Sequence, residues 1–529
     1  MNRWLNKANQ KASLINAAAL LVGTAMVGQL LGFMRTQVVN GSFNTTFHIT
    51  TDAYFAAFKI PDFFFYTIAA GALGVAFMPF LSDKLQKGDR EAVWKMTSSL
   101  LNFLGIIMFA VGIVLLVFTE PLLRLVVGHN LSPSQTHDAV IIMRLVAFNP
   151  LLFTISGILT SVQQTYGRFF FYAMAPIVYN SCIIASVYIF RHNIGLIGLG
   201  IGALAGAILQ LLIVLFGLYG LRFHYRRGID YGDKEFRGVL NNLPPRSIDQ
   251  GLDSINSIVE TNRASTLAPG SITVYENAYT LHLAPILLIG TAISTAAFPR
   301  LNARLAQGRP DLFRRDFLMV LRAMIWIVVP IVVITFFTRA YLARLIFKNP
   351  QPDIAIVLGF LTGAIFFRTI YSLISRWFYA QKDTRTPLFT SLFAIGLNIV
   401  LAFSLSRPSS YGLAGLAIAQ SMVAGAEVLI LVSIMLYRDP KLFDSAFWGG
   451  ISRILSVTGF TILVTYIMVT LVPLDLTDRG FIKLSAKLLA IVIPTLTVHI
   501  ALSAVFGLDE VRPVLNKLRK IVFKPVPIQ

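Results

Sequence analysis

The chain has 529 residues, of which 56% are hydrophobic and only 13% charged, and its net charge is +20. A soluble protein of this length does not need so large an apolar share to fill its core. Composition therefore indicates an integral membrane protein and excludes a soluble, basic nucleic-acid-binding protein. The single cysteine, Cys182, cannot form an intrachain disulfide.

Apolar runs long enough to cross a bilayer recur along the whole chain. A hydrocarbon core of roughly 30 Å requires about 20 apolar residues per helix. We place 14 such runs, at 12–39, 52–80, 96–118, 139–163, 169–190, 194–220, 246–267, 272–298, 317–338, 354–380, 386–406, 411–437, 449–472 and 482–506. The first run is longer than the apolar part of a signal peptide, so we interpret it as a helix. The sequence predicts an all-α polytopic membrane protein with 14 transmembrane helices.

A duplicated pattern runs through these segments. Gln164–Arg168 resembles Gln381–Arg385, and Gly195–Leu199 resembles Gly412–Leu416, and both pairs are related by the same offset along the chain. The copies keep the same direction, and each holds six predicted helices. We therefore expect parallel repeats about an axis along the membrane normal, with a central cavity between two pseudo-symmetric lobes.

A second match sets the order of the copies, because Pro79 and Pro299 end similar segments at nearly the same offset. We predict an N-terminal lobe at 1–227 with helices 1–6 and a C-terminal lobe at 228–440 with helices 7–12. Residues 441–529 then form helices 13–14 and a basic cytoplasmic tail.

The basic residues concentrate in alternate loops, which indicates that those loops are cytoplasmic and that both termini lie inside. They are Arg3, Lys7, Lys11, Lys84, Lys87, Arg90, Lys95, Arg222, Arg226, Arg227, Lys234, Arg237, Arg300, Arg304, Arg309, Arg314, Arg315, Lys382, Arg385, Arg512, Lys517, Arg519, Lys520 and Lys524. An exception is the loop before the tenth helix, which holds Arg339, Arg344 and Lys348.

The seventh predicted helix carries a stripe of polar residues. Asp249, Asp253, Asn256, Glu260 and Arg263 recur at spacings of four, three, four and three, which places them on one helical face. Such a face should not contact lipid, so it either lines a water-filled cavity that handles a charged substrate or coupling cation, or forms an internal salt-bridge ladder.

Ionisable residues also occur in the first two predicted helices. Arg35 either contacts substrate or extends to the membrane interface, and Asp52 is placed to cap the helix that it starts. Lys59 lies in an apolar run, where its ammonium needs a carboxylate such as Asp62 or a ligand anion. Pro61 lies within the same run and is expected to bend the helix.

Nothing in the sequence points to catalysis. No hydrophilic stretch is long enough to fold as a soluble domain, and there is no phosphate-binding Gly-Lys-Ser/Thr loop or metal-spaced His/Cys set. We expect a non-enzymatic transporter without a cofactor, driven by the membrane potential, the substrate gradient or a coupling cation such as sodium or a proton.

Three early segments, Leu31–Arg35, Thr51–Asp62 and Ala70–Pro79, resemble the MurJ (MviN) family of lipid II flippases. The resemblance implies the multidrug/oligosaccharidyl-lipid/polysaccharide exporter fold. It also implies export of an undecaprenyl-pyrophosphate-linked peptidoglycan precursor across the bacterial cytoplasmic (inner) membrane by alternating access. The lipid tail would lie in a groove formed with the last two helices.

The resemblance carries over residue by residue. Arg35, Asp52 and Lys59 match family positions, whereas family arginines are replaced by Gln29, Phe65 and Tyr279. A cation site of some members would keep Glu260 and Asn398 and find Ala402 in place of an aspartate. The predicted substrate-binding residues are Arg35, Asp52, Lys59, Asp62 and Arg263, and the predicted cation or cavity residues are Asp253, Glu260 and Asn398.

We therefore predict a lipid II flippase whose partners are the lipid-linked glycan, membrane lipids and proteins of cell-wall synthesis. Two alternatives remain open. The chain could be an exporter of another lipid-linked glycan or a cation-coupled drug antiporter of the same superfamily, as the acidic stripe suggests. It could also be a non-transporting scaffold that recruits cell-wall enzymes through its basic loops.

Overall fold

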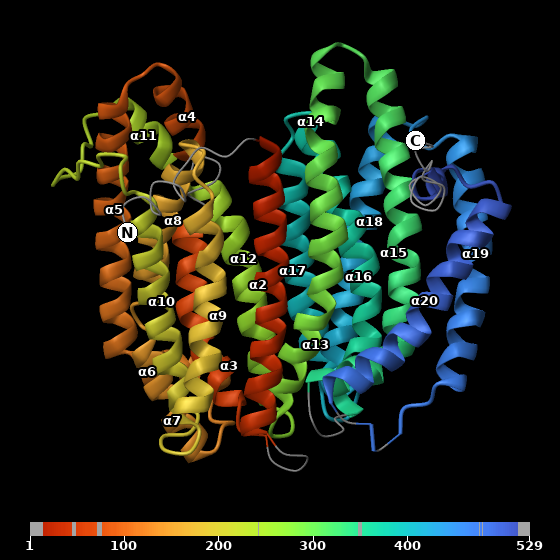
Figure 1. The fold of residues 1–529 in the computed structure, drawn as a ribbon, viewed down its shortest axis with the longest axis horizontal. Helices are drawn as coiled ribbons and strands as arrows, with labels where there is room; N and C mark the ends of the chain where they lie inside the picture. The colour runs from red at the N-terminus through yellow and green to blue at the C-terminus, as the bar shows by residue number, and fades with distance from the viewer. Residues whose placement is uncertain are drawn as a thin grey trace, which may run out of the picture. The chain divides into compact units, whose positions relative to one another are not determined.

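The protein is described by a computed structural model that covers residues 14–44, 49–70, 77–241, 243–346, 352–475, 477–478 and 480–516. The elements of regular structure among the described residues are all helical, with no strand among them. The chain forms two compact units, unit 1 at Met1–Thr273 and unit 2 at Val274–Gln529 (Figure 1). The predicted lobe boundary at 227 follows the sequence repeat. The boundary between the compact units lies after residue 273, so the helices at Lys234–Asn241 and Leu243–Ser265 belong to unit 1.

Unit 1 is built from the helices that precede residue 274, and the first turn of α13 (Ser271–Pro285) also belongs to it. Its elements are α2 (Leu14–Phe43), α3 (Asp52–Phe64), the π-helical η1 (Phe65–Ala70), α4 (Met78–Gln86), α5 (Arg90–Val117), α6 (Thr119–Val127), α7 (Pro133–Leu145), α8 (Asn149–Thr165), α9 (Phe170–Phe190), α10 (Ile197–Gly217), α11 (Lys234–Asn241) and α12 (Leu243–Ser265).

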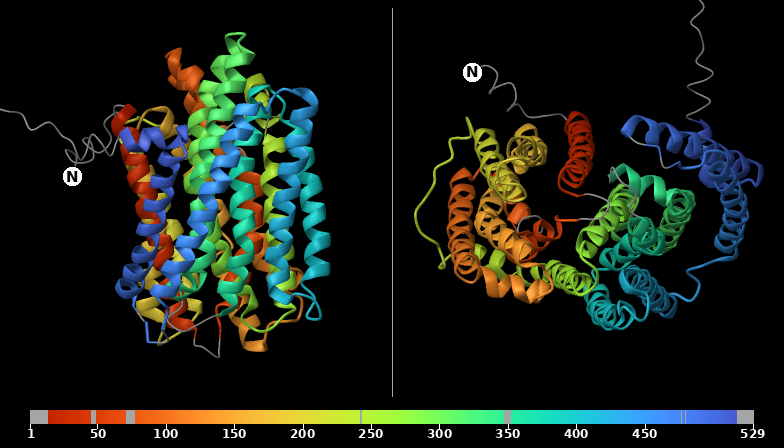
Figure 2. Two further views of the ribbon diagram at one scale, coloured as in Figure 1. Left: turned by 90° about the vertical axis from the view of Figure 1, so that its right-hand side faces the viewer. Right: turned by 90° about the horizontal axis from the view of Figure 1, so that it is seen from below.

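Unit 2 continues α13 and ends with two long helices and a single 3-10 turn. Its elements are the π-helical η3 (Ile286–Thr291), α14 (Ala292–Ala306), α15 (Pro310–Ile346), α16 (Pro352–Ala380), α17 (Arg385–Leu405), α18 (Gly412–Arg438), α19 (Ser445–Leu471), α20 (Phe481–Val505) and η4 (Asp509–Val511). Within this unit, α19 and α20 pack on each other and on α15, beside the α15–α18 group (Figure 2). Most of the predicted basic tail, from residue 517 onward, lies outside the described residues.

Eleven helical segments among the described residues are long and apolar enough to span a membrane, so the chain is a multi-pass membrane protein. They correspond to 11 of the 14 predicted runs. The other three runs are helical where described but are not among these spans. Run 12–39 falls in α2 and begins outside the described part, run 52–80 is divided between α3, η1 and residues 71–76 that are not described, and run 246–267 falls in the polar α12.

The structure repeats the turns that the sequence repeats. Gly88 and Gly308 have φ of 78° and 68°, a region that favours glycine, and each follows the C-terminus of a short helix, α4 or α14. In both turns the next backbone N–H donates a 3.0 Å hydrogen bond to a carbonyl of the preceding helix, from Asp89 to Lys84 and from Arg309 to Arg304. The two glycines are related by the offset that relates Pro79 to Pro299.

The helices that follow in each copy keep the predicted order. The starts of α9 and α17, at Phe170 and Arg385, are as far apart along the chain as the starts of α10 and α18, at Ile197 and Gly412. This common separation is slightly shorter than the offset between the sequence motifs. The repeat that the sequence predicts is therefore a repeat of helices.

Small residues let neighbouring helices approach closely in both units. In unit 1, α10 presents Gly198, Gly202 and Gly206 at four-residue spacing toward α9, and a Cβ at any of them would overlap an α9 side chain. Because lipid tails are as apolar as the helix surfaces, helix association in a membrane depends on such close van der Waals packing. This stripe therefore stabilises the α9–α10 pair.

The turn between α16 and α17 supplies a prediction for stability. The Asp383 carboxylate accepts hydrogen bonds from the Arg385 and Thr386 backbone N–H groups at 3.0 Å, and from the Thr386 hydroxyl and the Arg438 guanidinium at 2.7 Å. Burial alone would raise the pKa of Asp383. The hydrogen bonds from Thr386 and Arg438 outweigh burial and lower this pKa from 3.8 to about 2.

A carboxylate with a lowered folded-state pKa stabilises the protein above its unfolded pKa and loses that effect as the pH falls through its folded pKa. We expect the detergent-solubilised protein to lose about 2 kcal/mol of unfolding free energy between about pH 4 and pH 2 because Asp383 protonates. The Asp383→Asn variant should be less stable at pH 7 and show a flatter acid profile in thermal unfolding. The exposed Asp353→Asn serves as control, and identical profiles for D383N and wild type would contradict the assignment.

Candidate functional site

Lys59 connects α3 to α12 in unit 1. Its side chain is half-buried, and its Nζ donates a 2.7 Å hydrogen bond to the Ser257 hydroxyl. The sequence proposed Asp62 or a ligand anion as its partner, so the described contact adds a neutral acceptor that the sequence did not indicate. A hydroxyl orients an ammonium without cancelling its charge, so this contact fixes the position of a cation within the helical part of unit 1.

Arg35 and Asp62 lie in one electrostatic neighbourhood. Each has a charge that acts on the hydroxyls of both Tyr54 and Tyr179, although the four residues come from α2, α3 and α9. Both charged side chains are half-buried, whereas Tyr54 is buried. The structure therefore brings together two predicted site residues and adds two tyrosines that sequence reasoning missed. Phenolic hydroxyls inside predicted spans were the available signal.

The polar stripe on α12 is divided by burial. Asp253 is exposed and Arg263 half-buried, whereas Asn256 and Glu260 are buried and joined by a 3.3 Å hydrogen bond from Asn256 Nδ2 to Glu260 Oε1. The side chain of Asp249 lies outside the described part of the chain. The stripe is thus not uniformly exposed. Its middle forms an internal hydrogen bond, whereas the Asp253 side chain is exposed.

Asp52 binds the start of α13 rather than capping its own helix. Its Oδ2 accepts from the Gly270 backbone N–H at 2.7 Å, and its Oδ1 accepts from the Thr273 N–H at 2.8 Å and the Thr273 hydroxyl at 2.6 Å. Asp52 therefore caps a helix, as predicted, but that helix is α13 rather than α3. Because it is only 3% exposed and accepts three hydrogen bonds, we interpret Asp52 as a positioning residue.

The residue before α13 is a glycine because of its backbone conformation. Gly270 has a φ of 92°, and a Cβ there would lie 2.7 Å from the Ile49 side chain. Only glycine combines this backbone conformation with so close an approach. Thr51 adds a 2.9 Å hydroxyl contact to Thr273, so the residues just before α3 and the first turn of α13 form one buried polar joint.

Both units contain a π-helical segment at the same place in the repeat. In unit 1, η1 follows α3 and its Pro61; in unit 2, η3 follows Pro285, the last residue of α13. Single π-helical turns interrupt the regular hydrogen-bond ladder and occur frequently at functional sites. The predicted bend at Pro61 thus coincides with a local departure from α-helical geometry, and Pro285 occupies the corresponding place in unit 2.

Unit 2 contains an ion pair inside its spans that sequence reasoning missed. Arg368 on α16 contacts Glu427 on α18 at 2.8 Å, and Ser391 on α17 donates to the same carboxylate at 3.3 Å. Both charged residues lie in predicted spans, so their position was a usable signal. The predicted cation residue Asn398 is buried on α17 in this unit, at 1% exposure, whereas Glu260 belongs to unit 1.

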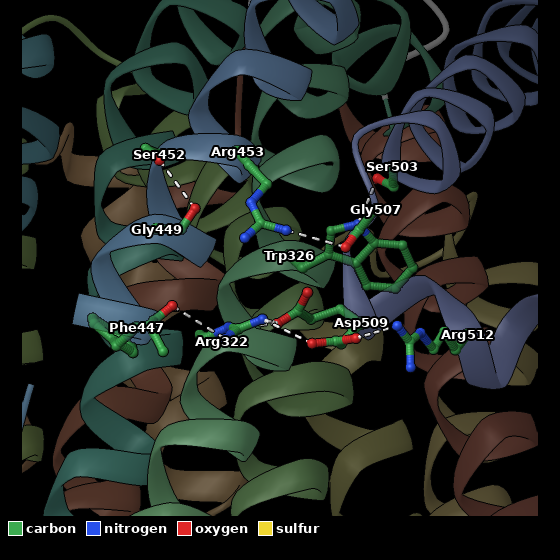
Figure 3. A network of polar contacts seen from close by, with 12 residues as sticks. Arg322, Trp326, Phe447, Gly449, Ser452, Arg453, Ser503, Gly507, Asp509 and Arg512 are labelled. Atoms are coloured by element: carbon green, nitrogen blue, oxygen red, sulfur yellow. Dashed lines mark hydrogen bonds and ion pairs between the residues drawn. The ribbon is translucent and has the colours of Figure 1, made fainter. Parts of the chain in front are cut away.

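A groove of about 970 Å³ lies in unit 2 between α15, the start of α19 and the segment after α20. Its lining mixes apolar and charged side chains, and Arg322 of α15 donates a 2.6 Å hydrogen bond from Nε to Glu510. Figure 3 shows Arg322 directed toward Asp509, whose carboxylate lies 3.9 Å from its guanidinium. Trp326 Nε1 attaches α15 to α20 by donating to the Ser503 hydroxyl at 2.8 Å. The groove has the dimensions and mixed lining of a site for an amphipathic molecule.

No group of three or more His, Cys, Asp or Glu side chains suited to a metal ion occurs among the residues that the structure describes. The arrangement instead consists of repeated membrane-spanning helices, charged side chains held inside those spans and a groove beside the last helix pair. Together these features define a multi-pass membrane transporter.

The comparisons with known proteins identify the family. The family profile "Lipid II flippase MurJ" matches residues 46–472. A protein of Borreliella burgdorferi described as a probable lipid II flippase MurJ is 23% identical over 433 residues, which are 80% of this chain and 83% of that protein. This chain therefore belongs to the MurJ family of lipid II flippases and is a transporter rather than an enzyme.

Solved structures agree on the fold. A lipid II flippase MurJ in an inward closed conformation matches with a TM-score of 0.77 at 24% identity, over 93% of this chain and 100% of that one. An inward-facing multidrug resistance MATE family transporter of the MOP superfamily matches with a TM-score of 0.66 at 15% identity, over 81% and 98%. The predicted exporter fold is therefore confirmed.

The joint at Asp52 supplies a prediction. Asp52→Ala should lower the unfolding free energy by about 2 kcal/mol, because it removes a helix cap and leaves buried donors at Gly270 and Thr273 unsatisfied. Thermal unfolding in detergent measures this loss. Asp253→Ala removes an exposed carboxylate of the same unit and should change stability by less than about 0.5 kcal/mol. Equal stability of D52A and D253A would refute the positioning role.

Proposed function

We propose that this protein moves lipid II, a polyprenyl-pyrophosphate-linked peptidoglycan precursor, from the inner to the outer leaflet of the bacterial cytoplasmic membrane by alternating access. The observation that carries the proposal is the half-buried cation Lys59, which a hydrogen bond to Ser257 positions between α3 and α12. A pyrophosphate is the kind of anion that an ammonium attracts strongly where water is scarce. Arg35, in the neighbourhood of Asp62, supplies a second cation in the same unit.

The substrate-binding set proposed here is Lys59 and Arg35 for the pyrophosphate, with Asp62 orienting Arg35. Arg263 and Asp253, the more accessible members of the α12 stripe, would contact the sugar-peptide part. Asp52 acts on this site by fixing the start of α13. We keep Glu260 and Asn398 as proposed polar residues of the transport path, with or without a coupling cation.

The groove of unit 2 suits the other end of such a substrate. Its apolar lining includes Leu318, Met319 and Ile327 from α15 and Phe447 from α19. Burying each CH₂ group of a hydrocarbon tail contributes about 0.8 kcal/mol, so a long polyprenyl chain can be held by such a surface. We propose that the groove holds part of the lipid tail.

The proposed topology has 14 helices with both termini in the cytoplasm, as the basic loops indicate. The repeated lobes at 1–227 and 228–440 would alternate the access of the site to the two sides, and 441–529 would add the groove. An inside-negative membrane potential favours outward movement of an anionic head group, by about 2.3 kcal/mol per charge at about 100 mV. A dedicated coupling ion is therefore not required by the energetics.

The first experiment is complementation in bacteria depleted of their own lipid II flippase. Wild type should restore growth, whereas Lys59→Ala and Arg35→Ala should lower flipping at least about tenfold, because each removes a charged contact to the pyrophosphate. Membrane levels must be equal. Lys87→Ala, which removes a 65%-exposed cation in the turn after α4, is the matched control and should rescue fully.

Failure of a well-inserted wild-type chain to rescue would contradict the lipid II assignment and favour another lipid-linked glycan. Full rescue by the Lys59→Ala and Arg35→Ala double variant would instead contradict the proposed cationic site. Normal recruitment of cell-wall enzymes by a transport-dead variant would support the scaffold function.

The groove is tested separately. Ala323 on α15 lines it, so Ala323→Trp should fill part of its volume and slow flipping of the long-chain lipid about tenfold or more in proteoliposomes. Leu463→Trp places the same side chain at an exposed position of α19 and is expected to leave the rate unchanged. Equal rates for A323W and L463W would place the lipid tail elsewhere.

A further inference from the structure

The ion pair between Arg368 and Glu427 is asymmetric. Glu427 is only 2% exposed, whereas 28% of the Arg368 side chain is exposed. The carboxylate is further fixed by Ser391, whose hydroxyl contacts the Tyr371 hydroxyl at 3.0 Å. One member of the pair is thus sealed and oriented by three helices, while the other retains an accessible part.

The depth of the pair limits what Arg368 can face. Arg368 lies near the middle of α16 and Glu427 near the middle of α18, both of which are membrane spans. A guanidinium exposed to acyl chains at that depth costs several kcal/mol. The accessible part of Arg368 therefore faces a polar space or a ligand rather than lipid.

The duplication shows that the fold does not require this pair. At the offset that relates Gln164 to Gln381, the positions of Arg368 and Glu427 correspond to Leu151 and Gln210 of the first copy. At the slightly shorter offset between the helix starts, they correspond to Phe153 and Leu212. None of these four residues is charged, so the first copy builds the equivalent helices without an ion pair. A purely structural role is also weakened because buried ion pairs contribute little net stability.

Lys59 of unit 1 resembles Arg368 in its charge and in the helix that it lies beside, although the two residues do not occupy the same position in the repeat. In unit 1, the cation of the second helix in the repeat is Lys59, but at the offset that relates Pro79 to Pro299 the chain has Tyr279 instead. Arg368 supplies a positive charge to this helix from outside, since its charge acts on the buried His282 of α13. Each unit thus has a cation beside its π-interrupted helix.

We infer that Arg368, held in place by Glu427, is an anion-binding residue of unit 2 that contacts the pyrophosphate of the substrate. Guanidinium groups bind phosphate through several parallel hydrogen bonds, and a sealed carboxylate behind the guanidinium fixes its direction before the ligand arrives. The inference rests on the proposed function for the identity of the substrate. The binding of a pyrophosphate group by a pre-oriented guanidinium does not depend on that identity.

The test measures binding of inorganic pyrophosphate and of lipid II to the purified full-length protein, with flipping in proteoliposomes. Arg368→Gln should weaken pyrophosphate binding at least about tenfold, and Arg368→Lys should restore part of it. Arg376→Gln, on the same helix and held over the rings of Phe298 and Tyr379, is the matched control and should bind as wild type.

Breaking a buried pair leaves an uncompensated carboxylate and can impair folding. The Arg368→Gln/Glu427→Gln double variant removes both charges, so it is expected to keep the wild-type unfolding temperature yet bind pyrophosphate as weakly as R368Q. Wild-type affinity in the folded double variant would overturn the inference. Loss of pH-dependent flipping in Glu427→Gln with unchanged pyrophosphate binding in R368Q would also overturn it and assign the pair to proton coupling.

The two proposals fail in different ways. If wild type does not rescue lipid II transport but still binds pyrophosphate through Arg368, the substrate assignment is wrong and the anion site stands. If wild type rescues and R368Q flips and binds normally, the anion site is wrong and the substrate assignment stands.

Discussion

A bilayer offers no water to a polar group, and this constraint governs the rest of the structure. Every charge and backbone group inside the spans must find a partner within the protein, a polar space or a ligand. The described helices pair their buried polar groups in three ways: a carboxylate on a helix start at Asp52, an amide–carboxylate contact at Asn256 and Glu260, and, within the spans, an ion pair at Arg368 and Glu427. Polar residues at membrane depth can therefore be sorted by how completely the protein encloses them.

Burial separates the residues that position their neighbours from the residues that we propose to bind substrate. Asp52 and Glu427 are almost completely buried and accept hydrogen bonds, so they fix the geometry of neighbouring helices or side chains. Lys59, Arg35 and Arg368 remain partly accessible, and all three are cations. The proposed transport of a pyrophosphate-linked lipid would require this division, because cations that bind the substrate must be held in place and still be able to reach it.

The duplicated architecture gives the same helical framework two different sets of charges. The glycine turns at Gly88 and Gly308 and the π-helical segments η1 and η3 recur in both units. The cations do not recur: one copy carries Lys59 on its own second helix, while the other places Arg368 on a different helix. Backbone geometry is repeated because packing requires it, whereas the packing of the helices does not require the same charges in both copies.

Composition, apolar runs and the repeat determined the class of this protein from sequence alone, because membrane spans are defined by length and hydropathy along the chain. The motif around Asp52 and Lys59 likewise indicated the family. Only the tertiary structure decided which helix Asp52 caps, that Ser257 is a partner of Lys59, and that Arg368 and Glu427 form a pair. Each of these contacts joins residues that are far apart in the sequence. A pattern along one helix records which face is polar, but it contains no information on which distant helix packs against that face.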